Sequence, residues 1–229
     1  MADQQMSQDE FAAYIAQKIQ TCSSQSRAPQ LVALSGPDCA GKSTLAVDVC
    51  KQLDRLDLTM SVKLLSMDAF LIPRHLRTPK TPEFMEYFEC AFDYPTLVET
   101  LKAVRYPMPS IDPNSVAKDT PDIVLVEGVF LLRKELYHWW NLTVWLEVDT
   151  SVIMNRAIKR DKEYFGDERT VQRVYENRCL PAQDYHIHRD LPKQNADIAA
   201  TFEEGLWTVH TSLATERALR EKGKGNETS

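Results

Sequence analysis

The chain has 229 residues, of which 43% are hydrophobic and 26% charged, and its formal net charge is −6. This length fits one α/β domain, and the acidic balance argues against a protein that binds nucleic acid over a broad surface. No stretch approaches the roughly 18 consecutive apolar residues of a membrane span, and the polar, acidic N-terminus lacks the pattern of a signal peptide.

The predicted elements alternate between helices and strands along the chain. Apolar residues at helical spacing predict a first helix over residues 9–20, and a short apolar run predicts a buried strand over 31–34. Similar patterns predict further strands over 61–66, 123–126, 143–148 and 196–201, and further helices over 43–53, 96–104, 151–162, 169–178 and 206–220. This alternation predicts a three-layer α/β fold, in which a five-stranded parallel sheet is flanked by helices.

The five cysteines are scattered and include no C-x-x-C pair. Such a set gives no support for a zinc site or a redox dithiol and is typical of free thiols in a reducing compartment. The expected location is therefore the cytoplasm.

One segment matches the phosphate-loop pattern G-x-x-x-x-G-K-[ST] in full: Gly36, Pro37, Asp38, Cys39, Ala40, Gly41, Lys42 and Ser43, with Thr44 directly after it. It follows a predicted strand and opens a predicted helix, so its backbone N–H groups and the positive end of the helix dipole point at one anion. Lys42 can reach the β- and γ-phosphates, and Ser43 offers a hydroxyl to Mg²⁺. We therefore expect residues 36–44 to bind ATP with Mg²⁺.

Two carboxylates follow predicted strands at the same edge of the sheet. Glu127 ends the apolar run 123–126, and Asp68 comes just after the strand at 61–66. Oxygen ligands suit Mg²⁺, so Glu127 is expected to help hold the metal. Asp68 is expected to accept the proton of an attacking hydroxyl. The alternatives are an exposed strand end for Glu127 and a helix cap for Asp68.

These features resemble the uridine kinase/phosphoribulokinase family of P-loop kinases, from about Leu31 to Ile198. Besides the phosphate loop, the resemblance rests on Asp68-x-Phe70, Phe92-Asp93-Tyr94-Pro95, Val126-Glu127-Gly128, Arg156…Arg160-Asp161 and Tyr175…Leu180-Pro181. It implies a kinase domain over residues 29–220, preceded by a helix and linker over 1–28 and followed by a disordered tail over 221–229.

The resemblance also implies roles for single residues. Asp68 is the general base, with Lys42 and Arg160 as further catalytic groups. Phe70 and Asp93 bind the acceptor together with Asp68. Arg156, Arg160 and Arg169 belong to a mobile lid at about 156–170 that closes over the phosphates and excludes water.

The acceptor stays open, because Ile111 and Val116 stand where uridine kinases usually have a Tyr and a His that hold the pyrimidine. Uridine or cytidine is the leading candidate for the acceptor, and nicotinamide riboside, pantothenate and a sugar or sugar acid are alternatives.

A GTPase switch is disfavoured because the chain has no N-K-x-D run. A catalytically silent nucleotide-binding regulator is the alternative of another class. The expected partner is a small molecule, with a homo-oligomer left open.

Overall fold

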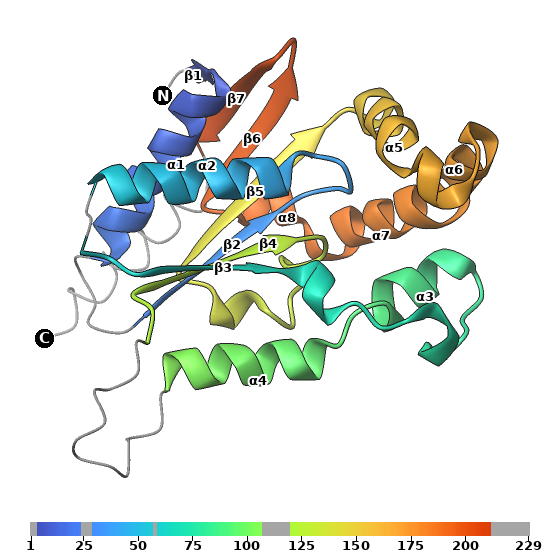
Figure 1. The fold of residues 1–229 in the computed structure, drawn as a ribbon, viewed down its shortest axis with the longest axis horizontal. Coiled ribbons are helices and arrows are strands. Elements are labelled where there is room, and N and C mark those ends of the chain that lie inside the picture. The colour runs from blue at the N-terminus through green and yellow to red at the C-terminus, as the bar shows by residue number, and fades with distance from the viewer. Residues whose placement is uncertain (1–3, 24–28, 57–58, 107–119, 212–229) are drawn as a thin grey trace, which may run out of the picture.

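The computed structural model describes residues 4–23, 29–56, 59–106 and 120–211, and a seven-stranded sheet runs through its centre (Figure 1). The strand order is β1-β7-β6-β5-β2-β4-β3. The strands are β1 (Gln4–Met6), β2 (Gln30–Ser35), β3 (Val62–Ser66), β4 (Ile123–Gly128), β5 (Leu142–Val148), β6 (Ile198–Glu203) and β7 (Leu206–Thr211).

The parallel part of the sheet contains all five strands predicted from the sequence. β3, β4, β2, β5 and β6 pair in parallel, and every residue of β2 and β4 is buried. Continuous apolar runs of this kind are typical of parallel strands covered on both faces. The predicted total of five strands is wrong, because β7 pairs antiparallel with β6, and β1 pairs antiparallel with β7.

The predicted helix over 206–220 is wrong for its first six residues, which form β7. Glu204 and Gly205 have φ values of 51° and 85°, and a two-residue turn of this kind reverses the chain into a hairpin. Trp207 and Val209 are then buried at alternate positions. Residues 212–220 of that predicted helix and the tail over 221–229 lie outside the described residues.

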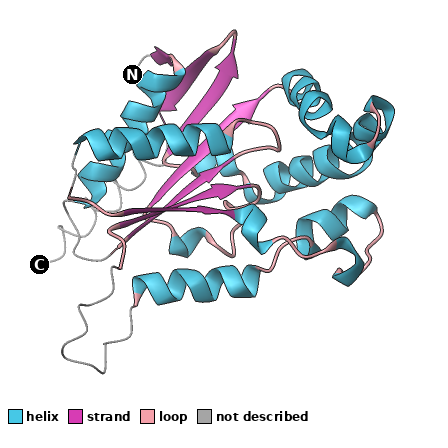
Figure 2. Ribbon diagram, in the orientation of Figure 1, coloured by secondary structure: helices cyan, strands magenta, loops and turns pink. Residues whose placement is uncertain are grey.

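Helices cover both faces of the sheet, with α1 and α2 on one face and α4 on the other (Figure 2). The helices are α1 (Gln8–Ser23), α2 (Lys42–Leu56), α3 (Glu83–Cys90), α4 (Tyr94–Arg105), α5 (Thr150–Phe165), α6 (Glu168–Val174), α7 (Leu180–Asp190) and α8 (Pro192–Asn195). Single turns are η1 (Met67–Phe70), η2 (Arg74–Leu76), η3 (Tyr137–Trp139) and the π-helical η4 (Tyr175–Cys179). In the described part of the chain, no helix combines the length and apolar character needed to cross a membrane.

The N-terminal helix α1 packs on the same domain. Phe11, Ile15 and Ile19 are buried, and the ring of Phe11 lies 5.2 Å from that of Trp207 on β7. α1 also packs along α2, the helix that follows the phosphate loop. The apolar face of α1 is thus part of the hydrophobic core.

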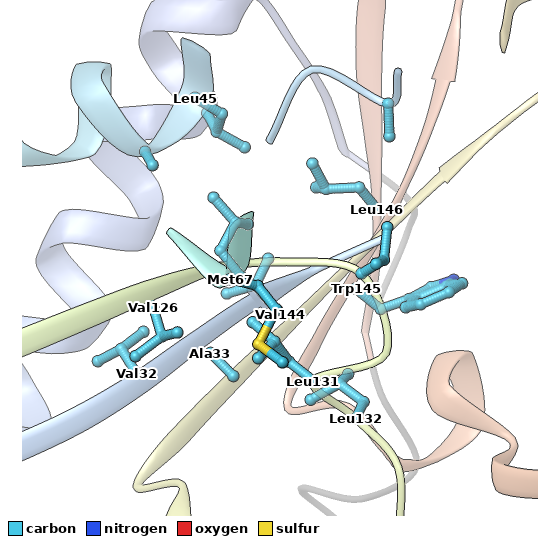
Figure 3. Close-up of a cluster of buried hydrophobic side chains, with 14 of the residues drawn as sticks. Val32, Ala33, Leu45, Met67, Val126, Leu131, Leu132, Val144, Trp145 and Leu146 are labelled. Carbon is cyan, nitrogen blue, oxygen red and sulfur yellow. The ribbon is translucent and has the colours of Figure 1, made fainter. Parts of the chain in front are cut away.

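The apolar core lies against the strands. Figure 3 shows Met67 in a buried cluster with Val126, Val144 and Leu131. Met67 is the first residue of η1, so it anchors the chain directly before Asp68. Beyond the carboxyl edge of the sheet, α3, α5, α6 and α7 gather (Figure 1).

Candidate active site

The phosphate loop joins the end of β2 to the start of α2. Cys39 and Gly41 have φ values of 58° and 97°, a left-handed backbone that glycine adopts without strain. A Cβ added to Gly36 would lie 2.7 Å from the carbonyl oxygen of Leu146 on β5. The loop therefore keeps its shape only with glycines at positions 36 and 41.

A cleft of about 330 Å³ opens at this loop, within the size range of small-molecule sites. It brings together ten of the predicted site residues: Asp38, Cys39, Gly41, Lys42, Ser43, Thr44, Asp68, Glu127, Arg156 and Arg160. Gly128 and Val129 complete the lining.

The other three predicted loop residues, Gly36, Pro37 and Ala40, do not line the cleft, and neither do three predicted residues from outside the loop. Phe70 is half-buried against the core. Asp93 caps α4, accepting hydrogen bonds from the backbone N and Oγ1 of Thr96 at 3.0 and 2.7 Å, and these bonds lower its pKa. Arg169 is exposed on α6. In this conformation the structure does not bring these last three residues to the phosphate loop.

Lys42 is folded back across the loop. The residue is only 7% exposed, and Nζ donates a hydrogen bond to the carbonyl oxygen of Pro37 at 2.6 Å. Burial lowers the pKa of Lys42, while the negative charges of Asp38 and Glu127 act in the opposite direction. The folded protein therefore holds an amine that is costly to charge, at the point where anionic phosphates are expected.

Glu127 is 5% exposed at the end of β4, which contradicts the alternative of an exposed strand end. Ser43 Oγ donates a hydrogen bond to its Oε2 at 3.2 Å, and no cation of the described residues forms an ion pair with it. A buried carboxylate beside a hydroxyl fits Mg²⁺, which takes few protein ligands and completes its shell with phosphate oxygens and water.

Asp68 faces the cleft from the first turn after β3. The cap of η1 is Ser66, whose Oγ accepts the backbone N–H of Asp68 at 3.3 Å, so the alternative of Asp68 as a helix cap is wrong. Partial burial raises the pKa of Asp68, and the charges of Glu127 and Asp38 raise it further. A carboxylate with a raised pKa is a better proton acceptor than a free aspartate.

The lid arginines on α5 reach the phosphate loop directly or through one residue. Arg156 donates to the carbonyl oxygen of Cys39 at 3.0 Å. Arg160 donates to Asp161 through Nε and NH2 at 2.6 and 3.0 Å, and it also donates to the hydroxyl of Tyr175 at 3.1 Å. Two guanidinium groups therefore lie beside the loop and can meet phosphate oxygens.

Tyr175, for which the sequence predicts no role, links the lid to the phosphate loop. It is 2% exposed, and its hydroxyl donates to Asp161 Oδ2 at 2.9 Å and lies 3.5 Å from Cys39 Sγ. Burial raises the pKa of the Cys39 thiol, so Cys39 stays protonated in this contact. Periodicity could not have revealed the link, because its parts come from three separate segments.

We expect Tyr175→Phe to raise the KM for ATP about three- to tenfold and to lower the free energy of unfolding by about 1–2 kcal/mol, since Asp161 and Arg160 lose a buried partner. Initial-rate kinetics and urea unfolding measure the two effects. Tyr164→Phe is the control, because Tyr164 on α5 is 86% exposed. Equal behaviour of the two variants would contradict the link.

Gly128 lets β4 pass close to η1. A Cβ on Gly128, whose φ is 159°, would lie 2.2 Å from Cβ of the fully buried Met67. We expect Gly128→Ala to lower the free energy of unfolding by about 1–3 kcal/mol through overpacking, and to lower kcat because Met67 positions Asp68. Thermal unfolding and steady-state kinetics test both effects.

Gly166→Ala is the matched control for Gly128→Ala. Gly166 has a φ of 94°, but an added Cβ there would meet nothing within 4 Å. It therefore separates backbone strain from the steric clash. If both variants lost the same stability and kept full activity, the clash with Met67 would not matter.

The fold and the phosphate loop are like those of P-loop kinases, and comparisons with known proteins agree. No family model matches the sequence. The chain is 28% identical over 200 residues to a pantothenate kinase of Listeria welshimeri, covering 80% of this chain and 62% of the relative. It is 26% identical over 163 residues to a uridine kinase of Lactobacillus johnsonii, covering 66% of this chain and 75% of the relative.

Solved structures share the fold. One, described as a possible uridine kinase from Bacillus stearothermophilus, has a TM-score of 0.61 and 20% identity, covering 82% of this chain and 96% of the other. D-glycerate 3-kinase from Cryptococcus neoformans has a TM-score of 0.54 and 12% identity, covering 86% and 99%. Together with the sequence relatives, they support the resemblance to the uridine kinase/phosphoribulokinase-like family of P-loop kinases. The chain spans less than two thirds of the length of the pantothenate kinases it matches.

Proposed function

We propose that the protein is an ATP-dependent kinase that transfers the γ-phosphate to a hydroxyl of a small molecule. One observation carries this proposal: Lys42, Glu127 and Asp68 line a single cleft at the phosphate loop. A protein that only binds nucleotide needs no proton acceptor there. The retained Asp68 therefore favours the kinase over the silent regulatory protein.

In the proposed in-line transfer of the phosphoryl group, each of these residues has a distinct role. The loop over residues 36–44 binds the phosphates of ATP, and Asp68 takes the proton from the attacking hydroxyl. Lys42, Arg156 and Arg160 stabilise the charge on the oxygens of the moving phosphoryl group. Ser43 and Glu127 would hold Mg²⁺, which supplies further positive charge to the phosphates.

The proposal also concerns the identity of the acceptor. The sequence favours uridine or cytidine by resemblance. Ile111 and Val116, the two residues that depart from the uridine kinase pattern, lie outside the described residues. Nicotinamide riboside, pantothenate and a sugar or sugar acid remain alternatives. Relatives bear the names pantothenate kinase and uridine kinase. We place the reaction in the cytoplasm, in keeping with five free cysteines.

A coupled assay of ADP release with Mg-ATP tests the proposal. The panel contains uridine, cytidine, nicotinamide riboside, pantothenate, and several sugars and sugar acids. We expect one compound to stimulate ADP release strongly. If ATP binds but no compound stimulates release, the regulatory alternative replaces the kinase.

A further inference from the structure

A second basic cluster lies beside the phosphate loop, and the proposed transfer does not use it. Arg178 is on η4, and its guanidinium lies 4.6 Å from the ring centre of Tyr87 on α3. Its Nε is buried and has no hydrogen-bond partner among the described residues. A buried guanidinium N–H without a partner is unfavourable, so an acceptor atom that reached it would gain a hydrogen bond at little desolvation cost to the arginine.

Arg77 adds positive charge to the same place. Its side chain is 5% exposed, and Nε donates to the carbonyl oxygen of Ile72 at 2.7 Å. NH1 lies 3.4 Å from Oε1 of Glu86. Burial lowers the pKa of Arg77, and the charge of Arg178 lowers it further. The cluster therefore combines two guanidinium groups with the carboxylate of Glu86, and only Arg77 pairs with that carboxylate.

Tyr87 connects this cluster to the catalytic cleft. Its hydroxyl donates to Asp38 Oδ2 at 3.0 Å, and Gln183 on α7 donates to the same oxygen at 2.7 Å. Asp38 lines the cleft together with Asp68. Arg178 therefore lies one aromatic side chain away from the phosphate loop. Figure 1 shows α3 facing α6 and α7 beyond the carboxyl edge of the sheet.

We propose that Arg178, supported by Arg77, binds a carboxylate of the acceptor, and that the substrate is therefore a hydroxy acid rather than a nucleoside. The proposal rests on the kinase function above and specifies its acceptor. A carboxylate presents two oxygens in the geometry of the guanidinium fork. The phosphates of ATP already have Lys42, Arg156 and Arg160 in the cleft, which leaves Arg178 for the other substrate.

The unpaired guanidinium N–H of Arg178 also selects against the other acceptors. Uridine, cytidine and neutral sugars bring no negative charge, and nicotinamide riboside is itself a cation. A site that holds an unpaired polar group discriminates strongly against ligands that cannot pair with it. Among the acceptors considered, pantothenate and the sugar acids meet this requirement.

The test compares acids with neutral counterparts of the same shape: pantothenate with pantothenol, and D-glycerate with glycerol. We expect an acid to stimulate ADP release and its neutral counterpart to be at least tenfold weaker in kcat/KM. Arg178→Gln should raise the KM of the acid about 10- to 100-fold, with the KM for ATP within about twofold. Arg178→Lys, which keeps the charge but loses the fork, should fall between the two.

Arg74→Gln is the matched control, because Arg74 on η2 is exposed and pairs with Glu83 on the surface. A second readout is calorimetric binding of pantothenate and D-glycerate in the presence of a non-hydrolysable ATP analogue. Acid binding that depends on Arg178, without turnover, would support the carboxylate site and overturn the kinase function. Turnover of a nucleoside or a neutral sugar would keep the kinase and overturn the carboxylate site. So would a rise in the KM for ATP alone in Arg178→Gln, or the absence of acid binding and turnover.

Discussion

Asp68→Asn is expected to lower kcat by about 10²–10⁴-fold and to leave the affinity for ATP nearly unchanged. The amide has the shape of the carboxylate but cannot take the proton of the attacking hydroxyl. Asp68 lines the cleft, and within the described part of the chain none of its hydrogen bonds holds the phosphate loop in place. ADP-release kinetics and equilibrium binding of a fluorescent ATP analogue measure the two quantities.

The control for Asp68→Asn is Asp9→Asn, which makes the same chemical change at an exposed position on α1. It should leave kcat within about twofold, as expected for a surface change far from the cleft. Normal turnover by Asp68→Asn would remove Asp68 as the base. A loss of ATP binding would instead give it a role in holding the nucleotide.

The pH profile offers an independent check on Asp68. Burial and the charges of Glu127 and Asp38 raise its pKa, so the carboxyl becomes protonated at a higher pH than a free aspartate. Since only the deprotonated form can accept a proton, kcat/KM should fall as the pH drops through this raised pKa. Asp68→Asn should lose this acid limb while its residual rate stays nearly flat.

The strands and the phosphate loop could be predicted because their signals are local. The runs before Gly36 and Glu127 are continuous and apolar, and parallel strands bring their ends to one edge. Residues 206–211 misled the prediction because six residues are too few to separate helical from alternating spacing. The turn at Glu204 and Gly205 was the better indication that residues 206–211 form the second strand of a hairpin.

The rest of the site could not be predicted because it depends on contacts between distant segments. Tyr87 and Gln183 hold Asp38 from α3 and α7, 49 and 145 residues away in sequence. No periodic pattern records such contacts. In contrast, Asp93 carries a strong local signal, but its carboxylate caps α4 in this structure, and its role toward the acceptor stays a prediction.

Lys42→Met is expected to lower kcat by about 10²–10⁴-fold while the free energy of unfolding stays unchanged or rises. The substitution should lower kcat without lowering stability because burial lowers the pKa of Lys42. Its charged form is disfavoured in the folded chain, so an apolar side chain of similar length removes a cost rather than a stabilising interaction. The lost hydrogen bond to Pro37 offsets only part of this gain.

Urea unfolding and ADP-release kinetics on Lys42→Met decide between a functional and a structural lysine. Lys51→Met is the control, since Lys51 is exposed on the same helix and pairs with Asp48 at 2.9 Å. It should change neither quantity by much, because exposed pairs of this kind contribute little to stability. A large loss of stability with kcat retained would mean that Lys42 serves to close the loop against Pro37. A large loss of kcat at full stability would mean that the fold tolerates a buried amine because the phosphates of ATP need its charge.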